Sequence, residues 1–191
     1  PFTESVILAN VKPVFDSEEV VYDGILAMLD EAESLFATGT GEFTATADVV
    51  YGGDVTKWRK FAASLKLKAL MRISSKRNVN AEVQALVDSG LLFSSNMDSA
   101  QLIYTSAQPD ANPIYETVVF GGRKEYKVSS VLVNALANTN DPRLPVYAQK
   151  NDADLYVGNV PGVENSGNYN GFSSPGTFYL QATLPGVILS N

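Results

Sequence analysis

The chain has 191 residues, enough for one globular domain or for part of a larger one. It contains no cysteine and no histidine, which excludes disulfides, thiolate metal sites, thiol nucleophiles and histidine-dependent catalytic triads. Fourteen basic and twenty-one acidic residues give a net charge of −7, so a nucleic-acid partner is not expected. The sequence also has no run of about eighteen apolar residues that would span a bilayer as a helix.

The first expected helix follows a stretch, residues 1–15, that has little pattern. Asp16 and Glu19 have the spacing of a capping box and predict that the helix starts there. Apolar residues then recur at helical spacing as far as about Ala37, and acidic residues occupy the other faces. The apolar positions are Val21, Ile25, Met28, Leu29, Ala32 and Phe36.

The longest helical pattern runs from about Asp54, a predicted N-cap, to Ser75, and it follows a glycine pair that suits a tight turn. Its single tryptophan, Trp58, lies on a broad apolar face and is predicted to belong to the core. Because only a modest loop separates the two long helices, we expect an antiparallel helical hairpin.

Eight of the fourteen basic residues lie between Lys57 and Arg77. They could form an anion-binding strip, but we favour a helix flank that faces the acidic residues of the preceding helix. The other expected elements before residue 141 are a short helix capped by Asn80 and ended by Gly90, a strand over Gln101–Thr105, an irregular stretch around Pro109 and Pro113, and a helix over Lys127–Asn138.

From residue 141 onward the composition changes. Only Arg143 and Lys150 remain as basic residues, while six of the fourteen glycines and five of the nine prolines fall here. Such segments are typically loops held on a scaffold, and their aromatic and amide side chains suit a sugar, which needs ring platforms and hydrogen-bonding groups. The alternative role for each ring is to fix a loop onto the helices. The ligand-binding candidates are Tyr147, Tyr156, Asn168, Tyr169, Asn170, Phe172 and Tyr179, with Asn165 as a further possible hydrogen-bonding residue.

Catalytic and metal-binding patterns are weak in this sequence. Asp152 and Asp154 could bind Ca²⁺, but they lack the glycine and later glutamate of a calcium-binding loop, and a solvated turn is favoured. No spacing nominates the pair of carboxylates that a glycosidase needs. We therefore expect no catalytic residue, no metal site and no cofactor.

The run from Tyr51 to Ile73 resembles an internal motif of the SusD/RagB-like outer-membrane nutrient-binding lipoproteins of Bacteroidetes. The phrase Asn140–Leu144 and the stretch Gly171–Tyr179 are also similar to that family. The residues of the long run that carry the resemblance are Tyr51, Gly53, Asp54, Lys57, Trp58, Lys60, Phe61, Ala62, Ser64, Leu65, Lys66, Leu67, Met71, Arg72 and Ile73.

The resemblance implies a mainly α fold of tetratricopeptide-like helical hairpins with long irregular loops and little β structure. Residues 1–191 would form one domain that is an incomplete part of a larger SusD-like domain, with a helical layer over residues 1–140 and a loop-rich segment over residues 141–191. We accordingly expect the sequence to be an internal part of a longer chain.

The resemblance also implies a function. The protein would bind oligosaccharides at the cell surface without catalysis and deliver them to a SusC-like, TonB-dependent outer-membrane transporter. It would touch the membrane only through a lipid anchor outside this sequence. Two alternatives remain open, namely a helical scaffold that docks on the transporter and capture of a non-sugar nutrient such as a peptide; a surface hydrolase ranks last. The family offers no invariant ligand residue, so the candidate residues rest on composition alone.

Overall fold

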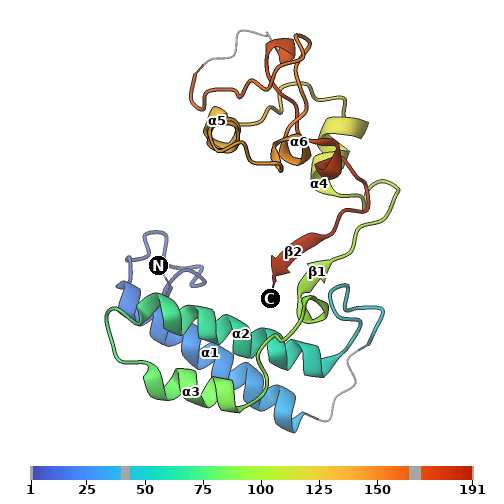
Figure 1. Cartoon of the computed structure of the whole chain (residues 1–191). Coiled ribbons are helices and arrows are strands. Elements are labelled where there is room, and N and C mark those ends of the chain that lie inside the picture. Colours follow the sequence, from blue (N-terminus) through green and yellow to red (C-terminus); the bar gives the residue numbers. More distant parts are fainter. Residues whose placement is uncertain (1, 40–43, 164–168, 191) are drawn as a thin grey trace. The chain divides into compact units, whose positions relative to one another are not determined.

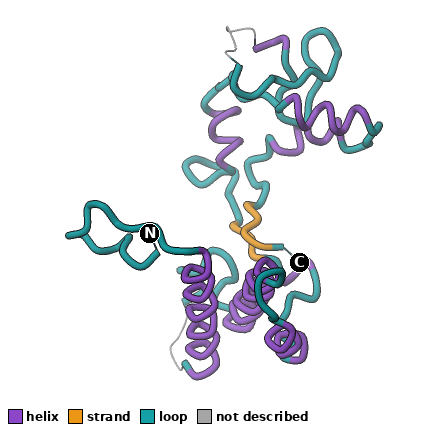
Figure 2. The backbone as a smooth tube through the Cα atoms, turned by 90° about the vertical axis from the view of Figure 1, so that its left-hand side faces the viewer, coloured by secondary structure: helices purple, strands orange, loops and turns teal. Residues whose placement is uncertain are grey.

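A computed structural model of the protein describes residues 2–39, 44–163 and 169–190. It divides into two compact units (Figure 1), one of Pro1–Gln101 with Val187–Asn191 and one of Leu102–Gly186. The structure is 44% helix and 6% strand, which confirms the predicted mainly α fold. Among the described residues, the two named strands pair with each other in one small sheet, drawn in orange in Figure 2. The assignment of the whole sequence to one larger SusD-like domain stays a prediction.

The first helix of the first unit is α1, Glu18–Thr38. Its N-cap is Ser17, whose hydroxyl accepts from the Val20 amide at 3.4 Å, and not Asp16 as the capping-box spacing predicted. The carboxylate of Asp16 instead accepts hydrogen bonds from the amide and hydroxyl of Thr3. A nearby loop therefore competes for the side chain that sequence spacing assigned to the helix end.

Helix α2, Val55–Ile73, corresponds to the longest predicted helix and ends two residues earlier than expected. The Asp54 side chain accepts from the Lys57 amide at 3.1 Å, which confirms the predicted N-cap. The helix packs on α1 around a core cluster that contains the fully buried Leu70. The other buried members are Leu26, Ala69 and Val79, and the flanking residues are Tyr22, Ile25, Ile73, Val83 and Leu86.

Three ion pairs fix the direction of this helical pair. Asp23 binds Arg77 at 2.7 Å, Asp30 binds Lys66, and Glu33 binds Arg59 at 2.6 Å. As the residue number rises on α1 it falls on the partner segment, so the hairpin is antiparallel, as expected. These contacts confirm that much of the basic run faces acidic neighbours.

Helix α3, Asn80–Asp88, follows α2 in this unit. Asn80 is its first helical residue and not its cap; the N-cap is Val79, which makes no side-chain cap hydrogen bond. The side chain of Asn78 accepts from the Asn80 amide at 3.0 Å and satisfies that donor. Gly90 follows the helix at a φ of +68°, a conformation that glycine adopts without strain, as the predicted stop requires.

The buried carboxylate of Asp48 holds the start of the Tyr51–Ile73 run in place. Asp48 accepts hydrogen bonds from three backbone amides, including Gly53 at 2.8 Å, and from the indole N–H of Trp58 at 2.8 Å. The ring of Trp58 contacts Tyr51 and Phe61 edge to face. Trp58 is half-buried rather than part of the fully buried core that the sequence predicted, and its N–H is satisfied by the buried Asp48.

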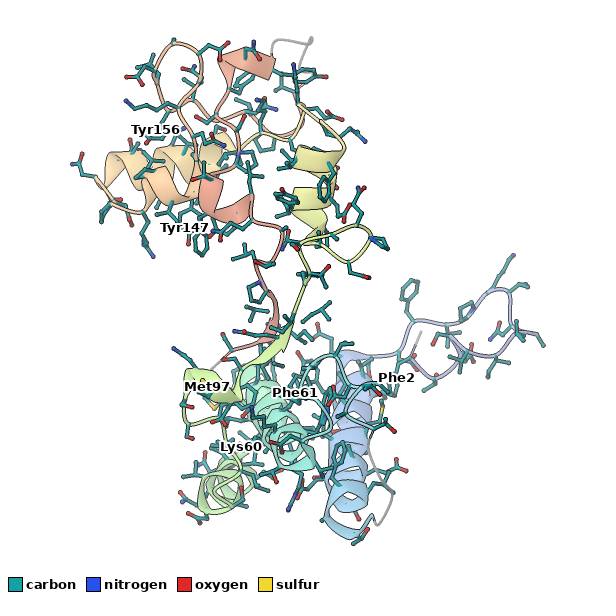
Figure 3. The ribbon with its side chains drawn as sticks, turned by 90° about the vertical axis from the view of Figure 1, so that its right-hand side faces the viewer. Phe2, Lys60, Phe61, Met97, Tyr147 and Tyr156 are labelled. Atoms are coloured by element: carbon teal, nitrogen blue, oxygen red, sulfur yellow. The ribbon has the colours of Figure 1, made fainter. Side chains whose placement is uncertain are left out.

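A second carboxylate ties α2 to the short helix η1, Asn96–Asp98. Asp98 accepts from Lys60 at 2.9 Å and from the Ser94 amide at 2.8 Å, while its backbone carbonyl accepts from the Tyr51 hydroxyl at 2.7 Å. Lys60 and Phe61, which both belong to α2, are labelled in Figure 3. Through these contacts, Tyr51 and Lys60 stabilise the fold by holding η1 against α2. Their described contacts are internal to the fold.

The chain crosses between the units through two paired strands, β1 (Ala100–Leu102) and β2 (Gly186–Leu189). The first covers part of the predicted strand Gln101–Thr105, and the second lies in the segment predicted to be loops. Among the described residues, no helix is long and apolar enough to cross a membrane.

The second unit has short elements joined by long loops. Helix α4, Pro113–Tyr115, and the π-helical turn η2, Glu116–Phe120, occupy a stretch that was predicted to be irregular. Pro113 does not prevent a helix here because it is in the first turn, where no amide donor is needed, and Asn112 caps it by accepting from Ile114 at 2.9 Å. Helix α5, Ser130–Asn138, starts three residues later than predicted, with Ser129 as its N-cap.

The described residues from 141 onward contain few regular elements. The regular elements found there, apart from β2, are the helical turns α6 (Leu144–Tyr147), η3 (Tyr169–Gly171) and η4 (Thr177–Tyr179). The core of this unit is a cluster of Val128, Val133 and Ala148, with Leu144 and Tyr156 packed against it.

Candidate functional site

Two helical turns meet to form an aromatic cluster in the second unit. Tyr147, the last residue of α6, stacks on Tyr179, the last residue of η4, with ring centroids 5.4 Å apart and an angle of 26° between the planes. The ring of Phe178 meets Tyr179 edge to face at 5.2 Å. Tyr147 and Tyr179 are half-buried, whereas Phe178 is 47% exposed. We call these three residues the aromatic cluster.

Backbone contacts hold the two turns together. The Gly176 amide donates to the Tyr147 carbonyl at 3.0 Å, and the Gln149 amide donates to the Ser174 carbonyl at 2.9 Å. A Cβ added at Gly176 would lie 1.9 Å from the Val146 carbonyl oxygen, so only glycine permits this approach. The stacking of Tyr147 on Tyr179 therefore depends on one glycine and on main-chain hydrogen bonds.

The start of α6 is fixed by a carboxylate. Asp141 accepts from the Arg143 amide at 2.9 Å and binds its guanidinium at 2.7 Å. The hydrogen bonds from Arg143 hold the pKa of Asp141 at about 2, below its usual range. The positive charge one turn before Tyr147 is thus already paired.

The chemistry of the cluster suits a neutral, hydroxyl-rich ligand. Aromatic rings pack against the apolar C–H faces of a sugar, and phenolic hydroxyls both donate and accept hydrogen bonds. Burial, and then the neighbouring Tyr147 hydroxyl, raise the pKa of Tyr179 above its ordinary value. A tyrosine hydroxyl is already neutral at physiological pH, and this shift moves its ionisation further from that range.

The other predicted residues lie elsewhere. Tyr156 packs against the core cluster of this unit and is separate from Tyr147 (Figure 3), which is the loop-fixing role considered for such rings. Tyr169 and Asn170 belong to η3, and the Phe172 amide donates to the Tyr169 carbonyl at 3.3 Å. No ring contact joins these residues to the aromatic cluster in the described part of the unit. Asn165 and Asn168 lie outside the described residues.

The Asp152–Asp154 loop is built as a turn. The side chain of Asn151 accepts from the amides of Ala153 and Leu155 at 3.0 Å each, and Lys150 binds Asp154 at 2.8 Å. Asp154 has a φ of +61°, a left-handed conformation common in turns. Across the described ranges, no group of three or more acidic side chains is placed to hold a metal ion.

Sequence reasoning missed Phe178 as a candidate. It directly precedes Tyr179 in the run Gly176-Thr-Phe-Tyr179, and a glycine followed by adjacent aromatic residues is a local signal for a tight turn that presents rings. Exposure of a large apolar ring next to a stacked pair is the structural feature that selects it.

Comparison with known proteins identifies the family. Residues 1–191 match the SusD-like family described as "Starch-binding associating with outer membrane". The chain therefore belongs to the SusD-like family, and the resemblance of the Tyr51–Ile73 run is confirmed. A search of curated proteins finds no match.

Solved structures agree with this assignment. An outer membrane protein of Bacteroides vulgatus ATCC 8482 associated with nutrient binding is 27% identical, with a TM-score of 0.75 over 100% of this chain and 46% of its own. A SusD homologue of Bacteroides fragilis NCTC 9343 is 25% identical, with a TM-score of 0.74 over 96% of this chain and 43% of its own. A chitin-binding protein is 26% identical, with a TM-score of 0.67 over 94% and 42%. The chain spans less than half the length of each of these structures.

Proposed function

We propose that the protein is a non-catalytic binder of neutral oligosaccharides at the outer surface of the cell. The observation that carries the proposal is the aromatic cluster, which presents an exposed Phe178 beside two stacked tyrosines on two helical turns joined by main-chain hydrogen bonds. Carbohydrate sites need such ring platforms with a few hydroxyl or amide groups and little fixed charge. Of the earlier candidates, Tyr147 and Tyr179 are the ones that we assign to this platform.

The family supports the same proposal. SusD-like proteins are described as starch-binding and associated with the outer membrane, and one similar structure is that of a chitin-binding protein. Starch and chitin are both uncharged polymers of pyranose rings, which fits a platform whose nearby cation is already paired. We infer that the ligand is delivered to a TonB-dependent outer-membrane transporter and that the protein is a surface lipoprotein.

Isothermal titration against starch-derived and chitin-derived oligosaccharides tests the proposal. We expect saturable binding of at least one series, and the Phe178→Ala variant should weaken it by about tenfold through the loss of one stacking contact. Tyr126→Ala is the matched control, because Tyr126 is also 47% exposed, lies in the same unit and is outside the cluster. Equal losses of affinity in both variants would show that the aromatic cluster is not part of the binding site.

The outcome also separates the alternatives. Binding of short peptides with no response to any oligosaccharide would favour capture of a non-sugar nutrient. Release of reducing sugar from the titrated oligosaccharides would instead show a hydrolase.

A further inference from the structure

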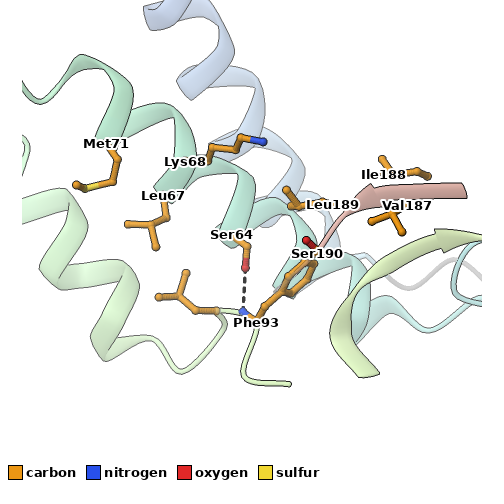
Figure 4. A pocket seen from close by; sticks show the side chains of 10 residues that line it. Ser64, Leu67, Lys68, Met71, Phe93, Val187, Ile188, Leu189 and Ser190 are labelled. Carbon is orange, nitrogen blue, oxygen red and sulfur yellow. Dashed lines mark hydrogen bonds between the residues drawn. The ribbon is translucent and has the colours of Figure 1, made fainter. Parts of the chain in front are cut away.

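The two units differ in the polar groups that they present. In the first unit, the hollow between α2 and residues 187–190 is lined mostly by apolar side chains, and the Ser64 hydroxyl there accepts from the Phe93 amide at 2.9 Å (Figure 4). Such a surface does not specify a ligand. In the second unit, an aspartate and an arginine beside the aromatic cluster hold hydrogen-bond donors in a fixed geometry.

Asp141 is anchored between two helices. Its amide donates to the Leu136 carbonyl of α5 at 2.9 Å, and its carbonyl accepts from the Leu144 amide of α6 at 3.1 Å. Its side chain is only 17% exposed, and one carboxylate oxygen accepts from the Arg143 amide at 2.9 Å. These contacts fix the carboxylate at the start of α6.

The carboxylate holds the Arg143 guanidinium along one edge. Nε donates to both carboxylate oxygens, at 2.9 and 3.2 Å, and Nη2 donates at 2.7 Å. Because the guanidinium is planar and rigid, a contact along the Nε–Nη2 edge also sets the direction of Nη1. Nη1 donates to no described residue, and the Arg143 side chain is 66% exposed. The pair therefore keeps the N–H donors of Nη1 oriented and accessible.

These donors lie beside the aromatic cluster. Arg143 is the N-cap of α6, and the amide of Tyr147 donates to its carbonyl at 3.2 Å, so the two residues are neighbours on one helical turn. The pKa of Arg143 is raised chiefly by Asp141 and also by Tyr147, so the phenol and the guanidinium are close enough to interact. Among the described residues, no cation lies over the ring of Tyr147, Phe178 or Tyr179. The guanidinium thus stands beside the rings and does not cover them.

We propose that Arg143 donates from Nη1 to an oxygen of the sugar bound at the aromatic cluster, and that Asp141 makes this site select neutral over acidic glycans. The inference rests on the glycan function proposed above and adds its polar specificity. An unpaired guanidinium would bind the carboxylate of a uronic acid by two parallel hydrogen bonds. Here Asp141 already occupies the Nε–Nη2 edge, so a second carboxylate would meet a neutralised cation and a nearby like charge. A hydroxyl or acetamido oxygen needs only a donor, which Nη1 supplies.

A comparison of neutral and acidic sugars tests this selection. The probes are maltohexaose and chitohexaose, each with a counterpart whose primary hydroxyls are oxidised to carboxylates, and binding is measured by calorimetric titration. We expect the neutral form to bind about tenfold more tightly than the acidic form. Asp141→Asn should reduce this preference to about twofold or less, because it frees the charge of Arg143. Its side-chain oxygen can still accept from the Arg143 amide, so the start of α6 is kept.

Glu125→Gln is the matched control for Asp141→Asn. Glu125 pairs with Arg123 two positions away in sequence, as Asp141 does with Arg143, and both substitutions remove one negative charge. Arg123 lies over the ring of Tyr126, 5.8 Å from its centroid, and is outside the aromatic cluster. An unchanged preference in Asp141→Asn, or an equal change in Glu125→Gln, would overturn the role of Asp141.

Removal of the donors tests Arg143 itself. Arg143→Met should weaken binding of the neutral oligosaccharide by about tenfold, through the loss of a hydrogen bond from a charged group, whereas Arg123→Met should not. Urea unfolding followed by circular dichroism establishes that the variants fold. If Arg143→Met is unstable, Arg143→Lys keeps the charge without the planar fork and should still lose affinity. Full affinity in a folded Arg143 variant would overturn the donor role.

The outcomes also separate this inference from the glycan function. If no oligosaccharide bound the unchanged protein, both would fail. If Phe178→Ala weakened binding while Arg143→Met and Asp141→Asn altered neither affinity nor preference, the aromatic cluster would remain the binding site, and only the roles of Asp141 and Arg143 would be wrong.

Discussion

The helical unit and the loop-rich unit are stabilised by different interactions. In the first, two packed helices are joined by ion pairs, and the buried carboxylates of Asp48 and Asp98 collect amide and side-chain donors. In the second, loops far apart in sequence are joined by backbone hydrogen bonds, such as those of Ser173 and Gly176. The first arrangement uses its side chains for the fold itself. The second relies on main-chain contacts, and its exposed Phe178 lies beside the stacked pair of tyrosines. The most recognisable run and the proposed binding residues therefore lie in different regions.

The largest effect is expected from Gly176→Val in the loop-rich unit. The new side chain would meet the Val146 backbone, and we expect a loss of about 4 kcal/mol in the free energy of unfolding together with loss of oligosaccharide binding. Circular dichroism during urea unfolding measures the loss. Thr177→Ala, at an exposed neighbouring position, should change little. A stable Gly176→Val variant that still binds sugar would show that the two turns need no close approach.

In the helical unit, the corresponding change is Asp48→Ala. It leaves three amides and the Trp58 indole N–H without their acceptor, and we expect a loss of about 3 kcal/mol. The only tryptophan of the chain is in this unit, so its fluorescence follows the unfolding of the helices. Oligosaccharide binding by the folded variant should be retained. Loss of sugar binding in a folded Asp48→Ala protein would contradict the separation of roles between the two regions.

A smaller effect is expected from acid. Burial alone would raise the pKa of Asp48, but hydrogen bonds from Gly53, Trp58 and neighbouring amides outweigh it and lower the pKa to about 2. Since the folded pKa is below the unfolded value, the stabilisation is present above about pH 4 and is lost as pH falls toward 2. Asp98, bound by Ser94 and Lys60, has its pKa lowered in the same direction.

Urea unfolding at pH 7 and pH 3, followed by Trp58 fluorescence, measures the stability that is lost when Asp48 is protonated. We expect about 1 kcal/mol less stability at pH 3 from Asp48, and the Asp48→Asn variant should show a correspondingly smaller change. Glu31→Gln, an exposed carboxylate on α1, serves as the control and should keep the normal pH dependence. An identical pH dependence in Asp48→Asn and the unchanged protein would exclude Asp48 as its source.

The smallest effect concerns the ion pair between Arg59 and Glu33. Both side chains are about one-third exposed, so solvent screens the pair and we expect a coupling energy of about 0.5 kcal/mol. A double-mutant cycle with Arg59→Gln and Glu33→Gln measures it. The same cycle with Arg72→Gln should give no coupling, because Arg72 forms no ion pair with Glu33. A coupling above about 2 kcal/mol would show that the hairpin depends on its surface charges more than on its core.

The helical unit was largely predictable because its signals are local. The helical spacing of apolar residues placed α1 and α2, and the N-cap at Asp54 needs only the amide of Lys57 three residues later. The local signal was wrong at the start of α1, where Asp16 was the predicted N-cap. The Asp16 carboxylate instead accepts hydrogen bonds from Thr3, which lies thirteen residues earlier in the chain. The anchoring role of Asp48 was not predicted, since it depends on a loop that folds back on Trp58.

The candidate site was less predictable because it depends on long-range approach. The composition nominated Tyr147 and Tyr179, but their contact requires residues 32 positions apart in sequence to meet. Tyr156 has the same composition context and instead packs on the core. The run Gly176–Tyr179 indicates a tight turn locally, but nothing in the sequence around Tyr147 shows that this turn approaches it closely at Gly176.

The pairing of β1 with β2 has a consequence for how such proteins can vary. The chain leaves the helical unit through one strand and returns through its hydrogen-bonded neighbour, so residues 102–186 form an insertion whose two ends are fixed side by side. An insertion anchored in this way can gain or lose residues, or be replaced, without a change in the host. If the aromatic cluster is the binding site proposed above, the ligand that it accepts can change through substitutions confined to the inserted segment.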